Sequence, residues 1–216
     1  MRGKFIVLEG LSGAGKSTTA NKLIDNFTKN GVEAVYHHGA CTDSEFGKNL
    51  KKMMVNNSFN NKQSALVTPF FIADILQDSI NTIKPLLDKG VYVIQDRYTD
   101  SIISYNNFSG IVNDELVDIQ PIFELYHSLG LILQPDITIL CQVKEKTLID
   151  RLIERKNIGK LTSVHQQYLD NPDYINLHQE QFIKLLNDSN GKYSIVETDN
   201  FSCYETIDKI SIQLLD

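Results

Sequence analysis

The first residues that could carry chemistry lie in GLSGAGKSTT, residues 10–19, directly after the apolar run FIVLE. Gly10, Gly15, Lys16 and Ser17 match the pattern G-x-x-x-x-G-K-[ST] in full. Glycines let the backbone curl so that several N–H groups face an anion, and a helix that starts there adds its positive dipole end. Lysine at this position suits the β- and γ-phosphates, and the serine hydroxyl suits Mg²⁺. The segment therefore predicts binding of ATP or GTP.

A second candidate site is VYVIQDRYTDSIISY, residues 91–105. Asp96 ends an apolar run typical of a strand, and a carboxylate at that place can bind Mg²⁺ or its hydration shell. Arg97 follows at once, and its guanidinium can bind a phosphate through two parallel hydrogen bonds. The alternative for Asp96 and Arg97 is a plain surface ion pair. We expect Ser17 and Asp96 to be the metal-binding residues.

A third candidate is the basic segment KEKTLIDRLIERKNIGKLT, residues 144–162. Arg151 and Arg155 lie four residues apart, so a helix would place them on one face. Arginines that neutralise charge on a transferring phosphoryl group raise rates by about 10³–10⁵-fold. We expect a lid over about residues 150–165 that closes over the triphosphate. The alternative is a solvated helix with local glutamate–arginine pairs.

Short β-rich runs that alternate with longer helical patterns must position these side chains. The expected strands are 4–9, 33–37, 91–95, 136–143 and 193–198. The expected helices are 15–29, 44–55, 67–88, 112–129, 144–156, 165–188 and 204–214. Three of the strand runs are almost continuously apolar, which is typical of parallel strands covered on both faces. We predict an α/β fold with a five-stranded parallel sheet, helices on both faces, and ligands beyond the carboxyl ends of the strands.

Composition limits the classes of partner. The chain has 216 residues and a net charge of −6, which argues against general nucleic-acid binding. Its three cysteines are widely spaced, so neither a disulfide framework nor a zinc site is indicated. No apolar run approaches the roughly 20 residues of a membrane span. We expect a small-molecule partner, no nucleic-acid or membrane partner, and a cytoplasmic location.

Three uses of the nucleotide site compete. A GTPase switch needs an N-K-x-D segment, but NKLID at 21–25 has the wrong spacing and NKQS at 61–64 lacks the acid. A motor ATPase would be longer. A small-molecule kinase should have an acceptor pocket beside the loop and a basic lid, which the three segments allow. A nucleotide-binding regulatory protein without catalysis is the second hypothesis.

In order and spacing, the segments FIVLEGLSGAGKSTT, FFIAD, VIQDRYTDSIISY and QPDITI resemble those of the thymidylate kinases, from residue 4 to about 190. They also resemble the wider nucleoside and nucleotide kinases. The resemblance implies one kinase domain over residues 1–216, of the nucleotide-kinase type of P-loop NTPase. It implies transfer of the γ-phosphoryl group of Mg·ATP to a nucleoside monophosphate, with dTMP favoured, and a homodimer.

The resemblance also implies roles for single residues. Phe71 would stack on the acceptor base and Arg97 would bind the acceptor phosphate. Because Gly13 is a glycine, the catalytic arginine is expected from the lid. The expected catalytic residues are Lys16, Arg97, Arg151 and Arg155. The expected nucleotide-binding residues are Gly10, Ser12, Gly13, Ala14, Gly15, Lys16, Ser17 and Thr18. The expected acceptor-binding residues are Phe71, Asp74, Arg97, Ser101 and Tyr105.

This chain departs from the thymidylate kinase pattern at three places, all on the acceptor side. Thr42 lies near the expected position of an arginine, and Ile75 replaces an arginine that reads the base, although isoleucine cannot donate a hydrogen bond. Ser12 stands where the family often has an acid that helps to hold the acceptor sugar. The candidate replacements for the arginines are Lys48, Lys51 and Lys52. The acceptor therefore stays open between dTMP, another monophosphate, a nucleoside and a non-nucleotide.

Overall fold

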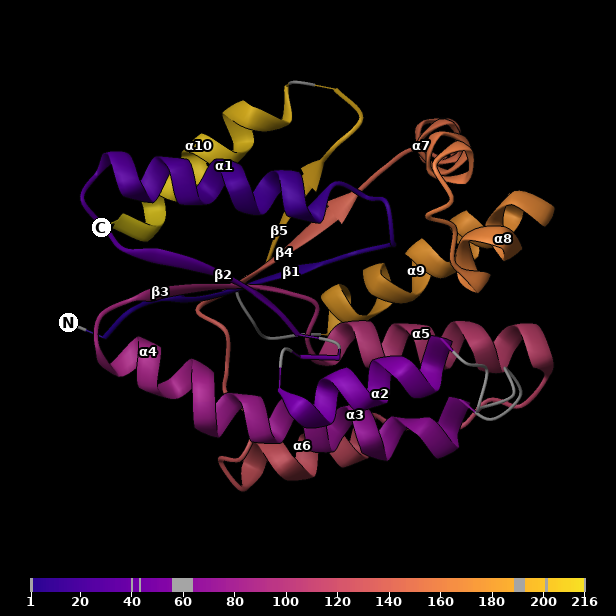
Figure 1. Cartoon of the computed structure of the whole chain (residues 1–216), viewed down its shortest axis with the longest axis horizontal. Coiled ribbons are helices and arrows are strands. Elements are labelled where there is room, and N and C mark those ends of the chain that lie inside the picture. Colours follow the sequence, from indigo (N-terminus) through magenta and orange to yellow (C-terminus); the bar gives the residue numbers. More distant parts are fainter. Residues whose placement is uncertain are drawn as a thin grey trace.

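The centre of the molecule is a parallel β-sheet, which confirms the predicted fold class (Figure 1). The computed structural model describes residues 2–39, 41, 42, 44–55, 64–188, 193–200 and 202–215. Within these residues the sheet has five strands in the order β2-β3-β1-β4-β5. The strands are β1 (Phe5–Glu9), β2 (Ala34–His38), β3 (Tyr92–Asp96), β4 (Ile137–Gln142) and β5 (Tyr193–Glu197). Because β1 lies between β3 and β4, the loops that follow these three strands meet at one edge of the sheet.

Helices cover both faces of the sheet (Figure 1). Helices α1 (Lys16–Lys29) and α10 (Cys203–Leu215) pack together on one face. The others are α2 (Glu45–Val55), α3 (Ser64–Asp78), α4 (Lys84–Asp88), α5 (Thr99–Asn113), α6 (Gln120–Ser128), α7 (Glu145–Asn157), α8 (Ser163–Asp170) and α9 (Asp173–Asp188). A π-helical segment, η2 (Ser79–Ile83), joins α3 to α4. In the part of the chain that is described, no helix has both the length and the apolarity needed to cross a bilayer.

The sequence of β1 does not alternate between apolar and polar residues, because both faces of the strand are buried. Ile6 and Leu8 pack into a core cluster with residues of α1 and α10, whereas Phe5 and Val7 pack into a second cluster with α3 and α5. All five residues of β1 are buried, as expected for a central parallel strand. A third cluster joins the loop after β1 to α5, α7, α8 and α9. Helices α7 and α8, which contain the expected lid segment, therefore share a core with this loop.

Two helix predictions were wrong in part. The predicted helix 112–129 is confirmed over α6, but it does not begin at 112, because α5 ends at Asn113 with Asp114 in the left-handed conformation (φ 55°) and α6 begins at Gln120. The predicted single helix 165–188 is divided into α8 and α9 at Asn171. Asn171 is extended because the Pro172 that follows disfavours the helical conformation of its predecessor.

Candidate active site

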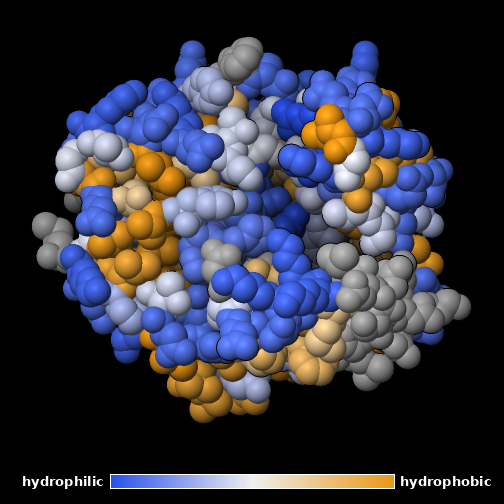
Figure 2. All heavy atoms as spheres, in the orientation of Figure 1, coloured by the Kyte–Doolittle hydropathy of each residue, from blue (hydrophilic) through white to orange (hydrophobic). Residues whose placement is uncertain are grey.

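The loop between β1 and α1 forms one wall of a cavity of about 640 Å³. Its glycines take positive φ values, and a Cβ atom on Gly10 would lie 2.4 Å from the carbonyl oxygen of Cys141 on β4. Only glycine fits such a close approach of two backbones. Figure 2 shows a hollow lined by hydrophilic residues beside the lobe that contains α7 and α8. The loop residues that line the cavity are Ser12, Gly13, Gly15, Lys16, Ser17 and Thr18.

The other two expected loop residues support the loop from behind. The carbonyl oxygen of Gly10 accepts hydrogen bonds from Lys16 Nζ (3.1 Å) and Arg97 Nη1 (3.2 Å). Ala14 is fully buried, its N–H donates to the Leu11 carbonyl, and its own carbonyl accepts from Thr198 Oγ1 at 2.6 Å. Neither residue lines the cavity, so both hold the loop in shape.

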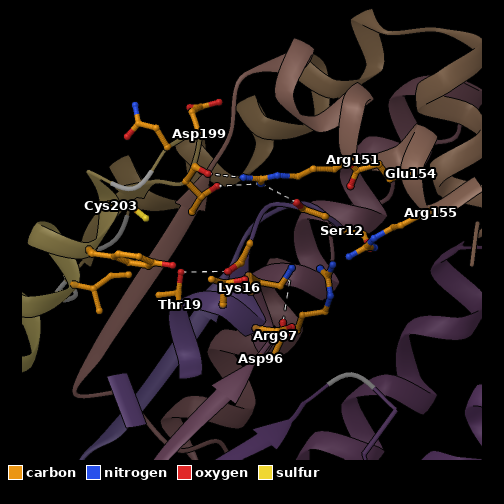
Figure 3. A pocket seen from close by; sticks show the side chains of 18 of the residues that line it. Ser12, Lys16, Thr19, Asp96, Arg97, Arg151, Glu154, Arg155, Asp199 and Cys203 are labelled. Atoms are coloured by element: carbon orange, nitrogen blue, oxygen red, sulfur yellow. Dashed lines mark hydrogen bonds and ion pairs between the residues drawn. The ribbon is translucent and has the colours of Figure 1, made fainter. Parts of the chain in front are cut away.

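Lys16 and Asp96 form the charged floor of the cavity (Figure 3). Lys16 Nζ also donates to the Leu11 carbonyl at 2.9 Å and lies 3.7 Å from Asp96 Oδ1. Burial, helped by the nearby Arg97, lowers the pKa of Lys16 to about 8. A bound polyphosphate would supply negative charge there and favour the protonated lysine.

The same floor offers two oxygen donors of the kind that Mg²⁺ prefers. Asp96 Oδ2 accepts a hydrogen bond from the Tyr36 hydroxyl at 2.7 Å, whereas the buried Oδ1 has no hydrogen-bond partner among the described residues. A buried carboxylate oxygen without a partner is costly, and a hard cation satisfies it. Ser17 lines the same cavity. Ser17 and Asp96 therefore fit Mg²⁺ when nucleotide phosphates complete its ligands.

Glu9, at the end of β1, caps helix α5 from another part of the chain. Its Oε1 accepts hydrogen bonds from the N–H groups of Tyr98 (2.8 Å) and Ser101 (3.1 Å), and its Oε2 accepts from the Ser101 hydroxyl. The first N–H groups of a helix need such acceptors, and Tyr98 at the N-cap supplies none from its side chain. The contact fixes α5, and with it Arg97, against β1.

This carboxyl gives the protein a predictable pH dependence. Burial, with the Asp100 carboxylate nearby, raises the pKa of Glu9 from 4.5 to about 7. Between those pH values the folded state binds more protons than the unfolded state, so the Glu9 contribution to the free energy of unfolding falls as pH rises, by up to about 3 kcal/mol. We expect Glu9→Gln, which keeps an acceptor oxygen, to remove this fall.

Urea unfolding of the wild type and Glu9→Gln at pH 5, 6, 7 and 8 checks this prediction. The difference between the two proteins cancels titrations that do not depend on Glu9, such as that of His165, whose pKa burial and the Arg155 charge lower to about 4. Stability of the wild type relative to the variant should fall with rising pH. A pH-independent difference would show that Glu9 does not titrate in this range.

Arg97 stands where this cavity meets a second one. Its backbone is left-handed (φ 76°), its Nη1 also donates to Ser101 Oγ at 3.1 Å, and its guanidinium lies 5.0 Å from the centroid of the Tyr105 ring. The second cavity measures about 440 Å³. Three residues line both cavities: Ser12, His38 and Arg97.

The second cavity has four of the five residues that the resemblance implied for an acceptor, with apolar walls. Phe71, Ser101 and Tyr105 line it together with Arg97. Its apolar walls come mainly from Val67, Ile102, Phe108, Val112 and Val164. The structure therefore brings together residues from α3, the loop after β3, α5 and α8 that lie far apart in the sequence.

Asp74 is the expected acceptor residue that the structure places outside both cavities. Its buried carboxylate accepts from the Thr42 N–H (2.9 Å) and from Thr42 Oγ1 (2.7 Å), so it anchors the segment before α2. Ile75 lies in the core cluster beneath the cavity and is 1% exposed. The three lysines proposed as replacements are exposed on α2 and line neither cavity: Lys48, Lys51 and Lys52.

The two lid arginines differ in their contacts, although both line the first cavity. Arg151 donates to the Gly13 carbonyl at 3.0 Å and to the carbonyl oxygen of Thr198, so it braces the loop against the end of β5. Arg155, one helical turn further, is half-buried and points toward the space beside Ser12 (Figure 3). Its guanidinium is the better placed of the two for a triphosphate.

His165 is a residue at the site that the sequence did not indicate. His165 Nε2 lies 2.7 Å from Ser12 Oγ, and its Nδ1 accepts from the Thr162 N–H at 3.1 Å. The available signal was Thr162 three residues before His165, which is the spacing of a capping box, but that motif usually ends in glutamate or glutamine.

Comparisons with known proteins agree with this geometry. Residues 8–208 match the family model described as thymidylate kinase. A thymidylate kinase of Brachyspira hyodysenteriae is 27% identical over 176 residues, which is 81% of this chain and 80% of that protein. A probable thymidylate kinase of Pyrococcus abyssi is 31% identical over 74% of this chain and 75% of its own length. A thymidylate kinase of Carboxydothermus hydrogenoformans is 30% identical over 74% and 76%. With its family pattern matched across nearly the whole chain, this protein belongs to the thymidylate kinase family.

Proposed function

We propose that this protein transfers the γ-phosphoryl group of Mg·ATP to the phosphate of a nucleoside monophosphate, and that dTMP is its preferred acceptor. The observation that supports this most strongly is the junction of two cavities at Ser12 and Arg97. One cavity carries the glycine loop and Lys16, and the other carries an aromatic side chain and apolar walls. This arrangement suits a phosphate donor on one side and a flat base on the other.

Phosphoryl transfer depends mainly on positioning and on neutralisation of charge. Lys16 and the N–H groups of the loop would bind the β- and γ-phosphates, and Arg97 would hold the acceptor phosphate in line with them. Arg155 would neutralise charge on the transferring group. Mg²⁺, bound by Ser17 and Asp96, would supply further neutralisation. Closure of α7 and α8 over the cavity would exclude water and so limit ATP hydrolysis.

The base preference follows from the walls of the second cavity. Phe71 offers a ring for stacking, and Val67 and Ile102 offer apolar surface that suits the 5-methyl group of thymine. Position 75 is an isoleucine that is buried in the core, so it cannot read the base as the arginine of the family pattern would. We therefore expect selection by shape rather than by a charged hydrogen bond. A missing methyl group in an apolar pocket costs about 10- to 200-fold, which sets the expected preference for dTMP over dUMP.

An ADP-release assay with ATP, Mg²⁺ and a panel of acceptors tests the proposal. The panel contains dTMP, dUMP, dCMP, dGMP and thymidine, and Lys16→Ala serves as the inactive control. We expect kcat/KM to be highest for dTMP and lower for dUMP by at least about 10-fold. Faster turnover of thymidine than of dTMP would overturn the monophosphate acceptor. Lack of stimulation by every acceptor would overturn the kinase activity.

A further inference from the structure

The contact between Ser12 and His165 joins the lid to the junction of the two cavities. Ser12 belongs to the glycine loop and lines both cavities. His165 lies in the first turn of α8, is 1% exposed, and places Nε2 at 2.7 Å from Ser12 Oγ. The two residues are 153 positions apart in the chain, so only the fold brings them together.

The hydrogen bonds of His165 define which nitrogen carries its proton. The Thr162 N–H points at Nδ1 from 3.1 Å, and a backbone N–H can only donate. Nδ1 is therefore the bare nitrogen, and the neutral ring carries its hydrogen on Nε2. A doubly protonated ring would set two N–H groups against each other at Thr162. The positive charges of Arg155, Arg97 and Lys16 also oppose a charged imidazole.

This tautomer fixes what the serine can do. The Nε2–H group of His165 donates to Ser12 Oγ, so the serine oxygen accepts and its own hydrogen remains available. Among the described residues, no second partner binds the Ser12 hydroxyl. An aspartate at this position would offer only acceptor oxygens, whereas this serine offers a donor to whatever occupies the junction.

We propose that Ser12 is a phosphate-binding residue at the junction of the two cavities, and that His165 is the positioning residue that aims its hydroxyl. The inference rests on the proposed function, because a phosphate oxygen at the junction belongs either to the donor nucleotide or to the acceptor monophosphate. Arg97 and Lys16 give the junction the positive charge that a phosphate requires. Since His165 lies on the lid, the hydroxyl is aimed only when the lid meets the loop.

Two variants of His165 separate this role from simple helix capping. Asparagine is short and can replace Nδ1 as acceptor for the Thr162 N–H, but it does not reach Ser12. Glutamine places an amide nitrogen near the position of Nε2 and can still donate to Ser12. We expect His165→Asn to lower kcat/KM for dTMP about 10-fold and His165→Gln to stay within about 3-fold of the wild type. A purely structural cap predicts that both variants stay close to the wild type, because asparagine and glutamine each offer an acceptor oxygen to the Thr162 N–H.

Ser12→Ala tests the hydroxyl itself. Loss of a hydrogen bond to a charged group corresponds to about a 10- to 100-fold fall in kcat/KM. If His165 acts through Ser12, the double variant Ser12→Ala/His165→Asn should have the same kcat/KM as Ser12→Ala. If the two residues act independently, the two fold-losses in kcat/KM should multiply. Gln166→Leu, which removes a neighbouring amide that binds Asp170 on the surface of α8, is the matched control.

Calorimetric binding identifies the phosphate. If Ser12 binds the acceptor phosphate, Ser12→Ala weakens binding of dTMP but not of thymidine. If it binds the γ-phosphate, Ser12→Ala weakens binding of a non-hydrolysable ATP analogue but not of ADP. Equal binding of all four ligands by Ser12→Ala and the wild type would overturn the inference. Absence of dTMP turnover in the wild type would instead overturn the proposed function, and the ATP-analogue and ADP measurements would still test the Ser12 contact.

Discussion

Replacing Arg155 with glutamine is expected to lower kcat about 10³-fold and to leave KM for ATP and for the acceptor nearly unchanged. The guanidinium lies on the cavity side of α7, beside Ser12 (Figure 3), where a transferring phosphoryl group would carry its developing charge. Arginines in that position contribute about 10³–10⁵-fold in rate. An interaction that forms only in the transition state appears in kcat rather than in KM. Steady-state kinetics with each substrate varied in turn measures the effect.

Two neighbours provide the controls. Lys156 is exposed, lies outside the cavity and follows Arg155 directly, so Lys156→Gln removes one positive charge from the same helix without touching the site. Arg151→Gln should behave differently from both, because Arg151 holds the carbonyl oxygens of Gly13 and Thr198. We expect it to raise KM for ATP and to lower the urea midpoint, since the carbonyls lose their partner.

One result would reverse the roles that we assign to Arg151 and Arg155. If Arg151→Gln lowered kcat about 10³-fold with unchanged KM and stability, while Arg155→Gln had little effect, Arg151 would be the charge-neutralising arginine. The sequence could not separate the two, because a spacing of four residues places both on one face of a helix. The distinction comes from the end of β5, where Thr198 binds one arginine and not the other.

The sheet was predictable because its central strands are short, almost continuously apolar runs in the sequence. The runs that became β1, β3 and β4 are apolar on both faces, and the structure buries them on both faces. Helix α5 was missing from the expected helices for a related reason. It packs against both α3 and α9 and buries residues on most of its circumference, so it lacks the amphipathic period that marks a surface helix.

Local motifs in the site were also predictable, whereas its long-range contacts were not. The glycine loop and the pair Asp96–Arg97 are short segments that residue type and spacing marked as candidates, and the structure places them at one cavity. The cap that Glu9 gives to α5 spans 89 residues, and the contact of His165 with Ser12 spans 153. Such contacts depend on which strands are neighbours, and no local pattern encodes that. The lysines of α2 were candidates for the acceptor site because of their charge, with a solvated helix face as the alternative, and the helix presents them to solvent.

Arg97→Lys is expected to raise KM for the acceptor monophosphate about 10²-fold and to change KM for ATP by less than about 3-fold. Lysine keeps the charge but loses the planar fork that binds two phosphate oxygens together. The backbone at Arg97 holds a left-handed conformation, which costs about 1–2 kcal/mol for a residue with a side chain. Such strain concentrates at functional sites, where the surrounding structure enforces it. Here the cap that Glu9 gives to α5 and the Gly10 carbonyl hold Arg97 in place from two sides.

Thymidine is the control ligand for Arg97→Lys. It should bind the variant and the wild type equally, because it has no phosphate for the guanidinium to bind. If Arg97→Lys weakened the binding of thymidine and of the monophosphate equally, Arg97 would shape the cavity and would not bind phosphate.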